Sequence, residues 1–196
     1  GFKARTELRK ESIPINNTLV FSQQQILAIC IHERIVQEQF GPLKNPEHAE
    51  GWPPFISPFV GRLDDKEEDG MSMVEHGMEM KRTFGFYPWK LQATTRRIEH
   101  LKRGIEAGAE LITAPANVYR EWFALSEDER NTLDEKTYAK ELSQTAFWNP
   151  PPSLLAIPSV EAFMEDITSG NLDISHPLTD AGLARFAQDW KAIITS

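Results

Sequence analysis

Two arginines follow segments with the apolar pattern of strands, and each lies close in the sequence to a hydroxyl side chain. Arg62 comes shortly after Ser57, and Arg96 shortly after Thr94. Guanidinium groups bind phosphate in a fork geometry and hydroxyls add hydrogen bonds, so these residues could hold a phosphorylated ligand. The alternative is that Arg62 pairs with an aspartate at position 64 or 65 on a solvated turn, and the residues alone favour this alternative.

Polar residues also alternate along the first predicted strand. Asn16 and Thr18 share one face of it, because successive side chains of a strand point to opposite sides. Taken alone, the pair is typical of polar residues in a barrel interior or near a turn. Asn16-Asn17-Thr18 also matches a glycosylation sequon, which we discount in a buried strand.

Two further patterns could indicate catalysis or metal binding. Lys90 shares a strand face with Thr94, and an interior lysine with a lowered pKa could form a Schiff base. The favoured interpretation is that Lys90 reaches solvent where its strand begins. His32-Glu33 begins like His-Glu-x-x-His, but Val36 occupies the fifth position, so no zinc site is predicted.

The composition narrows the class of protein. The chain has 196 residues, 40% of them hydrophobic, a single cysteine and a net charge of −8. This acidic balance argues against a nucleic-acid or membrane-surface partner, but it does not exclude a phosphorylated ligand, which needs only a few local cations. No apolar run approaches the roughly 20 residues of a membrane span and no signal peptide is expected, so we expect a cytoplasmic protein.

The elements that must position these residues alternate regularly. Four strands are predicted, at 15–20, 54–57, 86–92 and 110–113. Helical patterns follow them, with a Ser-x-x-Gln capping box at Ser22 and a terminating glycine at Gly108. This β-α alternation predicts a parallel sheet with helical crossovers.

Two segments interrupt the alternation and are predicted to be insertions, at 37–54 and 126–175. The second contains Trp148 and the apolar stretch Leu154-Leu155-Ala156-Ile157, which is too apolar for a solvated linker. We expect it to pack against the exterior of the fold or against a neighbouring subunit. Four β/α units alone would leave unpaired parallel edges, so the architecture calls for a partner half.

Four segments resemble motifs of the transaldolase family, in the family's order and spacing. The most specific is Ser-Pro-Phe-Val-Gly-Arg at 57–62. The others are Asn-Asn-Thr-Leu-Val-Phe-Ser at 16–22, Ala-Thr-Thr-Arg-Arg-Ile at 93–98, and His-Pro-Leu-Thr-Asp with its following helix at 176–190. Thr94 stands where the family has a serine in the third of these.

The resemblance implies an α/β fold of the (β/α)₈ TIM barrel family, with this chain supplying about the last four β/α units. It implies transfer of a dihydroxyacetone unit between sugar phosphates, as in the pentose phosphate pathway, through a lysine Schiff base and without metal or cofactor. Gly1 is similar to a glycine that follows the strand of that lysine, so the lysine and its acidic partners are expected upstream. The chain alone is therefore expected to be inactive.

Roles for individual residues also follow from the resemblance. It implies that Thr18 orders a catalytic water and that Asn16 contacts substrate hydroxyls. It assigns the phosphate to four side chains: Ser57, Arg62, Thr94 and Arg96. Phe59 stands where the related fructose-6-phosphate aldolases carry a proton-transferring tyrosine, and phenylalanine cannot transfer a proton, which favours transaldolase chemistry.

Two alternatives stay open at this point. One is a non-catalytic sugar-phosphate-binding or interaction fragment that folds with a separate N-terminal half. The other is a fructose-6-phosphate aldolase-like lyase, which Phe59 disfavours. The expected partners are a sugar-phosphate substrate and the N-terminal half of the barrel; a homo-oligomer is also open, whereas nucleic acid and membrane are not expected.

Overall fold

The computed structural model describes residues 1–43, 54–86 and 90–194, apart from the side chains of Lys90 and Gln92. Its centre is a sheet of four parallel strands in the order β1-β2-β3-β4. These strands are β1 (Asn16–Val20), β2 (Phe55–Pro58), β3 (Lys90–Thr94) and β4 (Leu111–Thr113). The predicted parallel pairing is confirmed. Each strand lies beside the next one in sequence, as expected when successive β/α units wind in one direction.

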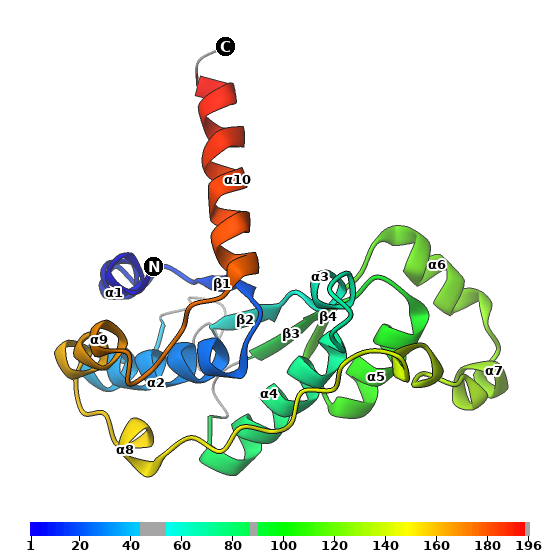
Figure 1. The fold of residues 1–196 in the computed structure, drawn as a ribbon, viewed down its shortest axis with the longest axis horizontal. Coiled ribbons are helices and arrows are strands. Elements are labelled where there is room, and N and C mark those ends of the chain that lie inside the picture. The colour runs from blue at the N-terminus through cyan, green and yellow to red at the C-terminus, as the bar shows by residue number, and fades with distance from the viewer. Residues whose placement is uncertain (44–53, 87–89, 195–196) are drawn as a thin grey trace.

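Helices connect and follow the strands (Figure 1). Those before β4 are α1 (Phe2–Lys10), α2 (Gln23–Phe40), α3 (Val60–Asp64), α4 (Gly70–Phe84) and α5 (Ile98–Ala107). Those after it are α6 (Ala116–Ala124), α7 (Glu127–Thr132), the 3₁₀ turn η1 (Thr137–Ala139), α8 (Pro152–Leu155), α9 (Val160–Ser169) and α10 (Pro177–Ile194). Figure 1 shows α2, α4 and α5 on one side of the sheet, where they form a single layer.

Small residues let two of these helices approach the sheet closely. A Cβ at Gly77 of α4 would lie 3.2 Å from Leu91 Cδ2, and one at Gly104 of α5 would lie 3.2 Å from Ile112 Cδ1. The side chains of Leu91 and Ala93 are buried against this helical layer. Asn16 and Thr18 are exposed, so polar residues of β1 do not face that layer. The core therefore lies between the sheet and the helices, as in one side of an α/β barrel.

The third strand begins later than predicted. The sequence pattern placed it at 86–92, whereas β3 covers Lys90–Thr94 and residues 87–89 lie outside the described residues. Gly85 ends α4 with φ of 72°, and the backbone N–H groups of both Gly85 and Phe86 donate to the carbonyl of Lys81. Helices that end with a glycine in the left-handed conformation often place an apolar residue directly after it, and Phe86 has this position here. Phe86 therefore belongs to the end of the helix.

The later part of the segment 126–175 packs along α2, whereas Tyr138 in its earlier part packs against α5. The Gln23 side chain bridges the carbonyl of Ala146 and the N–H of Trp148, at 2.7 and 2.8 Å. Arg34 donates to two carbonyls of the same segment, and Phe163 of α9 is completely buried. The predicted insertion at 37–54 begins inside α2, which continues to Phe40, and its residues 44–53 lie outside the described residues.

The C-terminal helix α10 projects from the rest of the chain (Figure 1). Its first turns touch β1, where a Cβ at Gly182 would lie 3.0 Å from Leu19 Cδ2. Beyond this contact its apolar side chains are more than half exposed, including Phe186 and Trp190. Among the described helices, none has the length and hydropathy needed to cross a membrane.

Candidate functional site

A pocket of about 380 Å³ lies where β2, β3 and β4 end. Its lining combines the loops after these strands with the start of α3: Phe59, Gly61, Arg62, Thr94, Thr95, Arg96, Thr113, Ala114 and Pro115. The pocket therefore brings together four of the predicted site residues, namely Phe59, Arg62, Thr94 and Arg96. We call it the anion pocket, because its two cations are the arginines. Sites at the carboxyl ends of parallel strands are the rule in barrels of this type.

The guanidinium of Arg96 is held by an aspartate of the α3 turn. Its Nη1 lies 2.7 Å from Asp65 Oδ1 and 2.8 Å from Oδ2, and both side chains are about half exposed. Gly61 makes room for the arginine stem, since a Cβ there would lie 2.2 Å from Arg96 Cδ. The Arg96 side chain thus passes over Gly61 of α3 to reach Asp65.

Arg62 itself is half-buried and makes no hydrogen bond or ion pair with any other described residue. The alternative interpretation of the sequence paired this arginine with an aspartate at position 64 or 65. In the structure Asp65 pairs with Arg96, and Asp64 contacts His100. Within the described part of the chain, Arg62 is therefore available to a ligand.

Thr94 ties the ends of two strands together. Its hydroxyl donates to the carbonyl of Pro58 and accepts from the N–H of Val60, at 3.3 Å for the second bond. An isolated bridge between Phe59 and Thr94 continues the β2–β3 pairing past the strands. The backbone that carries Arg62 is therefore fixed directly to the backbone that carries Arg96.

Ser57 does not join this pocket. Its side chain is buried, and its Oγ donates to Asn16 Oδ1 at 2.7 Å. The prediction that Ser57 converges with the two arginines is thus not met by its geometry. The hydroxyl crosses from β2 to β1 instead and fixes the amide of Asn16. Asn16 is exposed, and it lines neither the anion pocket nor the larger pocket beside β1 that is described next.

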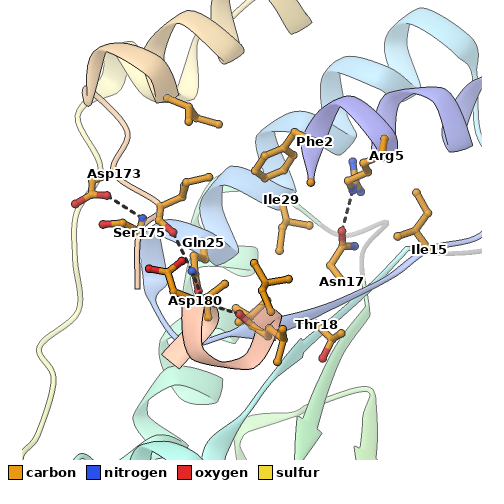
Figure 2. Close-up of a pocket in the computed structure, with 18 of the residues that line it drawn as sticks. Phe2, Arg5, Ile15, Asn17, Thr18, Gln25, Ile29, Asp173, Ser175 and Asp180 are labelled. Atoms are coloured by element: carbon orange, nitrogen blue, oxygen red, sulfur yellow. Dashed lines mark hydrogen bonds between the residues drawn. The ribbon is translucent and has the colours of Figure 1, made fainter. Parts of the chain in front are cut away.

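Thr18 lies at a second and larger pocket of about 680 Å³ (Figure 2). This pocket runs along the outer edge of β1 between α1 on one side and the start of α10 on the other. Figure 2 shows Arg5 and Asn17 on the α1 side, and Asp173, Ser175 and Asp180 on the opposite side. Leu19 has φ of 62° and interrupts the strand's alternation, so Leu19 and Val20 are both buried while Thr18 stays exposed.

A buried ionic cluster lies behind the α1 side of this larger pocket. Glu33 accepts from Arg5 Nη2 at 2.5 Å and from Arg9 Nε at 2.8 Å, and all three side chains are at most 5% exposed. Arg5 also donates to Asn17 Oδ1 of β1 at 2.9 Å. His32 accepts a hydrogen bond from Arg5 through Nδ1. Burial, followed by the charges of Arg5 and Arg9, lowers the pKa of His32 to about 3, so the imidazole is neutral.

This cluster was not predicted from the sequence. Arg5 and Arg9 are four residues apart, which places both on one face of a helix, and this spacing was the available signal. His32-Glu33 was weighed only as the start of a zinc motif. The structure uses both side chains to join α1 to α2.

A sequence model of the family described as Transaldolase/Fructose-6-phosphate aldolase matches residues 1–196. The chain belongs to this family of TIM-barrel aldolases. It is 29% identical over 192 residues to a "Probable transaldolase" of Lactiplantibacillus plantarum, covering 98% of this chain and 56% of that protein. A "Probable transaldolase" of Myxococcus xanthus is 27% identical with the same coverage. A third, from Hydrogenobaculum, is 32% identical over 63% of this chain.

The chain spans about half the length of the curated relatives that it matches over nearly all its residues. The resemblance read from the motifs at 16–22, 57–62, 93–98 and 176–190 is therefore confirmed at the level of the family. The general activity that these names carry is of the transaldolase type.

Proposed function

We propose that this chain provides the sugar-phosphate-binding half of a transaldolase, an enzyme that transfers a dihydroxyacetone unit between sugar phosphates. The convergence of Arg62 and Arg96 in one pocket, from two successive β/α units, is the observation that carries this proposal. Two guanidinium groups at the mouth of a parallel sheet suit a phosphate dianion, which each can bind through paired N–H donors. Sugar phosphates offer this group at the end of a chain of hydroxyls.

We propose that the other site residues contact the part of the sugar that lies away from the phosphate. We propose that Asn16 contacts substrate hydroxyls, with its amide oriented by the hydrogen bond from Ser57. Thr18 is exposed on the same strand, and we propose that its hydroxyl orders the water used in proton transfer. Ser57 in this arrangement supports the sugar end of the site and does not touch the phosphate.

The rest of the barrel is proposed to come from residues upstream of Gly1. β1 and β4 are the outer strands of the described sheet, and each has one edge without a strand partner among the described residues. Unpaired parallel edges are rarely left in water, so a second set of strands that closes the sheet would satisfy both. The resemblance implies that the Schiff-base lysine lies on that second set.

Phe59 lines the anion pocket and has no proton to transfer. Its ring packs edge-on against Phe21 with centroids 5.8 Å apart. The absence of a hydroxyl at this position favours transaldol transfer over the aldolase branch of the family, which is expected to use a tyrosine here.

Removing either arginine of the anion pocket tests the proposal. We expect Arg62→Ala or Arg96→Ala to weaken binding of fructose 6-phosphate by about 1.5–3 kcal/mol, the range for hydrogen bonds to a charged group. Isothermal calorimetry on the natural full-length protein measures the change. Arg185→Ala is the matched control, because that arginine lies exposed on α10 and pairs with the exposed Asp189 at 3.8 Å. An unchanged affinity in both pocket variants would count against the assignment.

Asp65 competes with the ligand for Arg96 in this account. We expect Asp65→Asn to tighten binding of inorganic phosphate about 1.5- to 5-fold, because an exposed ion pair is worth about 0.2–1 kcal/mol and the ligand no longer has to displace it. Titration by calorimetry at low ionic strength measures the affinity. Weaker binding in Asp65→Asn would mean that Asp65 holds Arg96 in its productive position and does not compete with the ligand.

A further inference from the structure

His100 occupies a buried position directly behind the anion pocket. It lies in the first turn of α5, and its side chain is only 1% exposed. Its Nδ1 accepts a hydrogen bond from the backbone N–H of Arg96 at 3.3 Å. Because Nδ1 accepts, a neutral ring carries its proton on Nε2. The imidazole therefore holds the turn from which the Arg96 side chain departs.

The other ring nitrogen reaches the helix that carries Arg62. His100 Nε2 lies 2.8 Å from Asp64 Oδ2, an ion-pair distance without the alignment of a good hydrogen bond. Asp64 is the last residue of α3, and its Oδ1 accepts from the N–H of Gly70 at 3.0 Å. Burial alone would raise the pKa of Asp64, but the contact with His100 and the Gly70 N–H outweigh it and lower that pKa. His100 is thus a link between the backbones of the two phosphate-binding arginines.

A tyrosine from the segment 126–175, Tyr138, packs against the His100 ring. The centroids of the Tyr138 and His100 rings lie 5.0 Å apart, and the guanidinium carbon of Arg97 lies over the Tyr138 ring, 4.7 Å from its centroid. The Tyr138 hydroxyl accepts from Arg103 at 2.9 Å. Arg103 is in turn fixed by two 2.8 Å bonds to Asp69, the residue that caps α4. The Tyr138 ring thus helps to bury the His100 side chain, which is 1% exposed, whereas the Asp64 side chain is 13% exposed.

We infer that His100 is a positioning residue for the anion pocket, which sets the separation of Arg62 and Arg96 through the Arg96 backbone and Asp64. The inference rests on the proposed function of the pocket and adds a residue that touches no ligand. A guanidinium pair binds a phosphate more tightly when the backbone segments that carry both arginines are fixed before the ligand arrives. Loss of His100 should therefore act on the binding of the phosphate, with little effect on the bond-making step.

Three substitutions in the natural full-length protein separate the two contacts of the ring. His100→Leu removes both of them. His100→Asn places an amide oxygen near the position of Nδ1 and keeps the bond to Arg96, whereas His100→Gln places an amide nitrogen near Nε2 and keeps the contact with Asp64. His76→Leu is the matched control, since His76 is a half-buried histidine of α4 outside the pocket lining.

We expect His100→Leu to raise the calorimetric Kd for inorganic phosphate, and the KM for fructose 6-phosphate, about tenfold, with kcat changed less than twofold. His100→Asn should recover at least half of the loss on a logarithmic scale, and His76→Leu should leave the Kd unchanged. An unchanged phosphate Kd in all three folded His100 variants would overturn the inference. It would also be overturned if the Asn, Gln and Leu variants lost phosphate affinity equally and in proportion to the fall in their unfolding midpoints. If Arg96→Ala also leaves the Kd unchanged, the proposed function of the pocket fails as well; if Arg96→Ala weakens binding and His100 variants do not, only the positioning role fails.

Discussion

A polypeptide limited to residues 1–196 is expected to transfer dihydroxyacetone units at least about 10⁴-fold more slowly than the natural full-length protein. The reaction needs an amine that forms an imine, because the imine stabilises the carbanion left by carbon–carbon cleavage. It also needs an acid/base pair, and one such group is worth about 10²–10⁴-fold in rate. The resemblance places all of these groups upstream of Gly1. We therefore expect residues 1–196 to bind a phosphate and to order a water, but not to form the covalent intermediate.

A coupled assay of kcat on both polypeptides, at matched concentration, measures this difference. Circular dichroism and calorimetric phosphate binding provide the control, since they show whether the shorter polypeptide is folded. Addition of a separately expressed N-terminal half should restore turnover. Turnover within tenfold of the full-length rate by residues 1–196 alone would contradict the expectation.

Glu33→Ala should cost the folded protein about 3–5 kcal/mol, the range for removing one partner of a buried ion pair. The substitution leaves the guanidiniums of Arg5 and Arg9 buried without their carboxylate, and the adjacent His32 is neutral and cannot replace it. At the scale of a chain of this size, the loss corresponds to a fall of about 6–20 °C in the melting temperature.

Urea unfolding measures the free energy, and Glu7→Ala is the matched control. Glu7 pairs with Lys10 on the exposed face of α1, so its removal should change stability by no more than about 0.5 kcal/mol. Because the cluster joins α1 to α2, Glu33→Ala should also increase hydrogen exchange in α1. Equal stabilities of Glu33→Ala and Glu7→Ala would show that the cluster contributes no net stability.

The order and type of the main elements could be predicted because each carries local signals. Gly108 ends α5 in the left-handed conformation, as the sequence indicates. Ser22 accepts the N–H of Gln25 at the start of α2, but the capping box is only half formed, because the Gln25 side chain accepts from the N–H of Phe21 and not from that of Ser22. The start of the third strand could not be predicted, because the choice between strand and helix ending at Phe86 depends on its packing against the core. The short helix α3 also escaped prediction, since its five residues are too few for a periodic pattern.

In the candidate site, too, features with a local sequence signal could be predicted, whereas contacts between distant segments could not. The motifs placed Arg62 and Arg96 at strand ends, and parallel pairing brings such ends together, so their shared pocket could be expected. The partners of these residues could not be expected. Asp65 with Arg96, and Tyr138 with His100, are contacts between elements that are more than 30 residues apart and that have no mutual signature in the sequence.

Borohydride trapping is the most direct test of the central claim that this chain is the phosphate-binding half of a Schiff-base transaldolase. The natural full-length protein is reduced in the presence of fructose 6-phosphate, and the modified peptide is mapped by mass spectrometry. The account predicts an adduct on a lysine upstream of Gly1, formed in Lys90→Met as in the unaltered protein, and reduced in yield by Arg62→Ala at limiting substrate. An adduct on Lys90 that disappears in Lys90→Met would contradict it, because the chain would then hold both the imine and the phosphate.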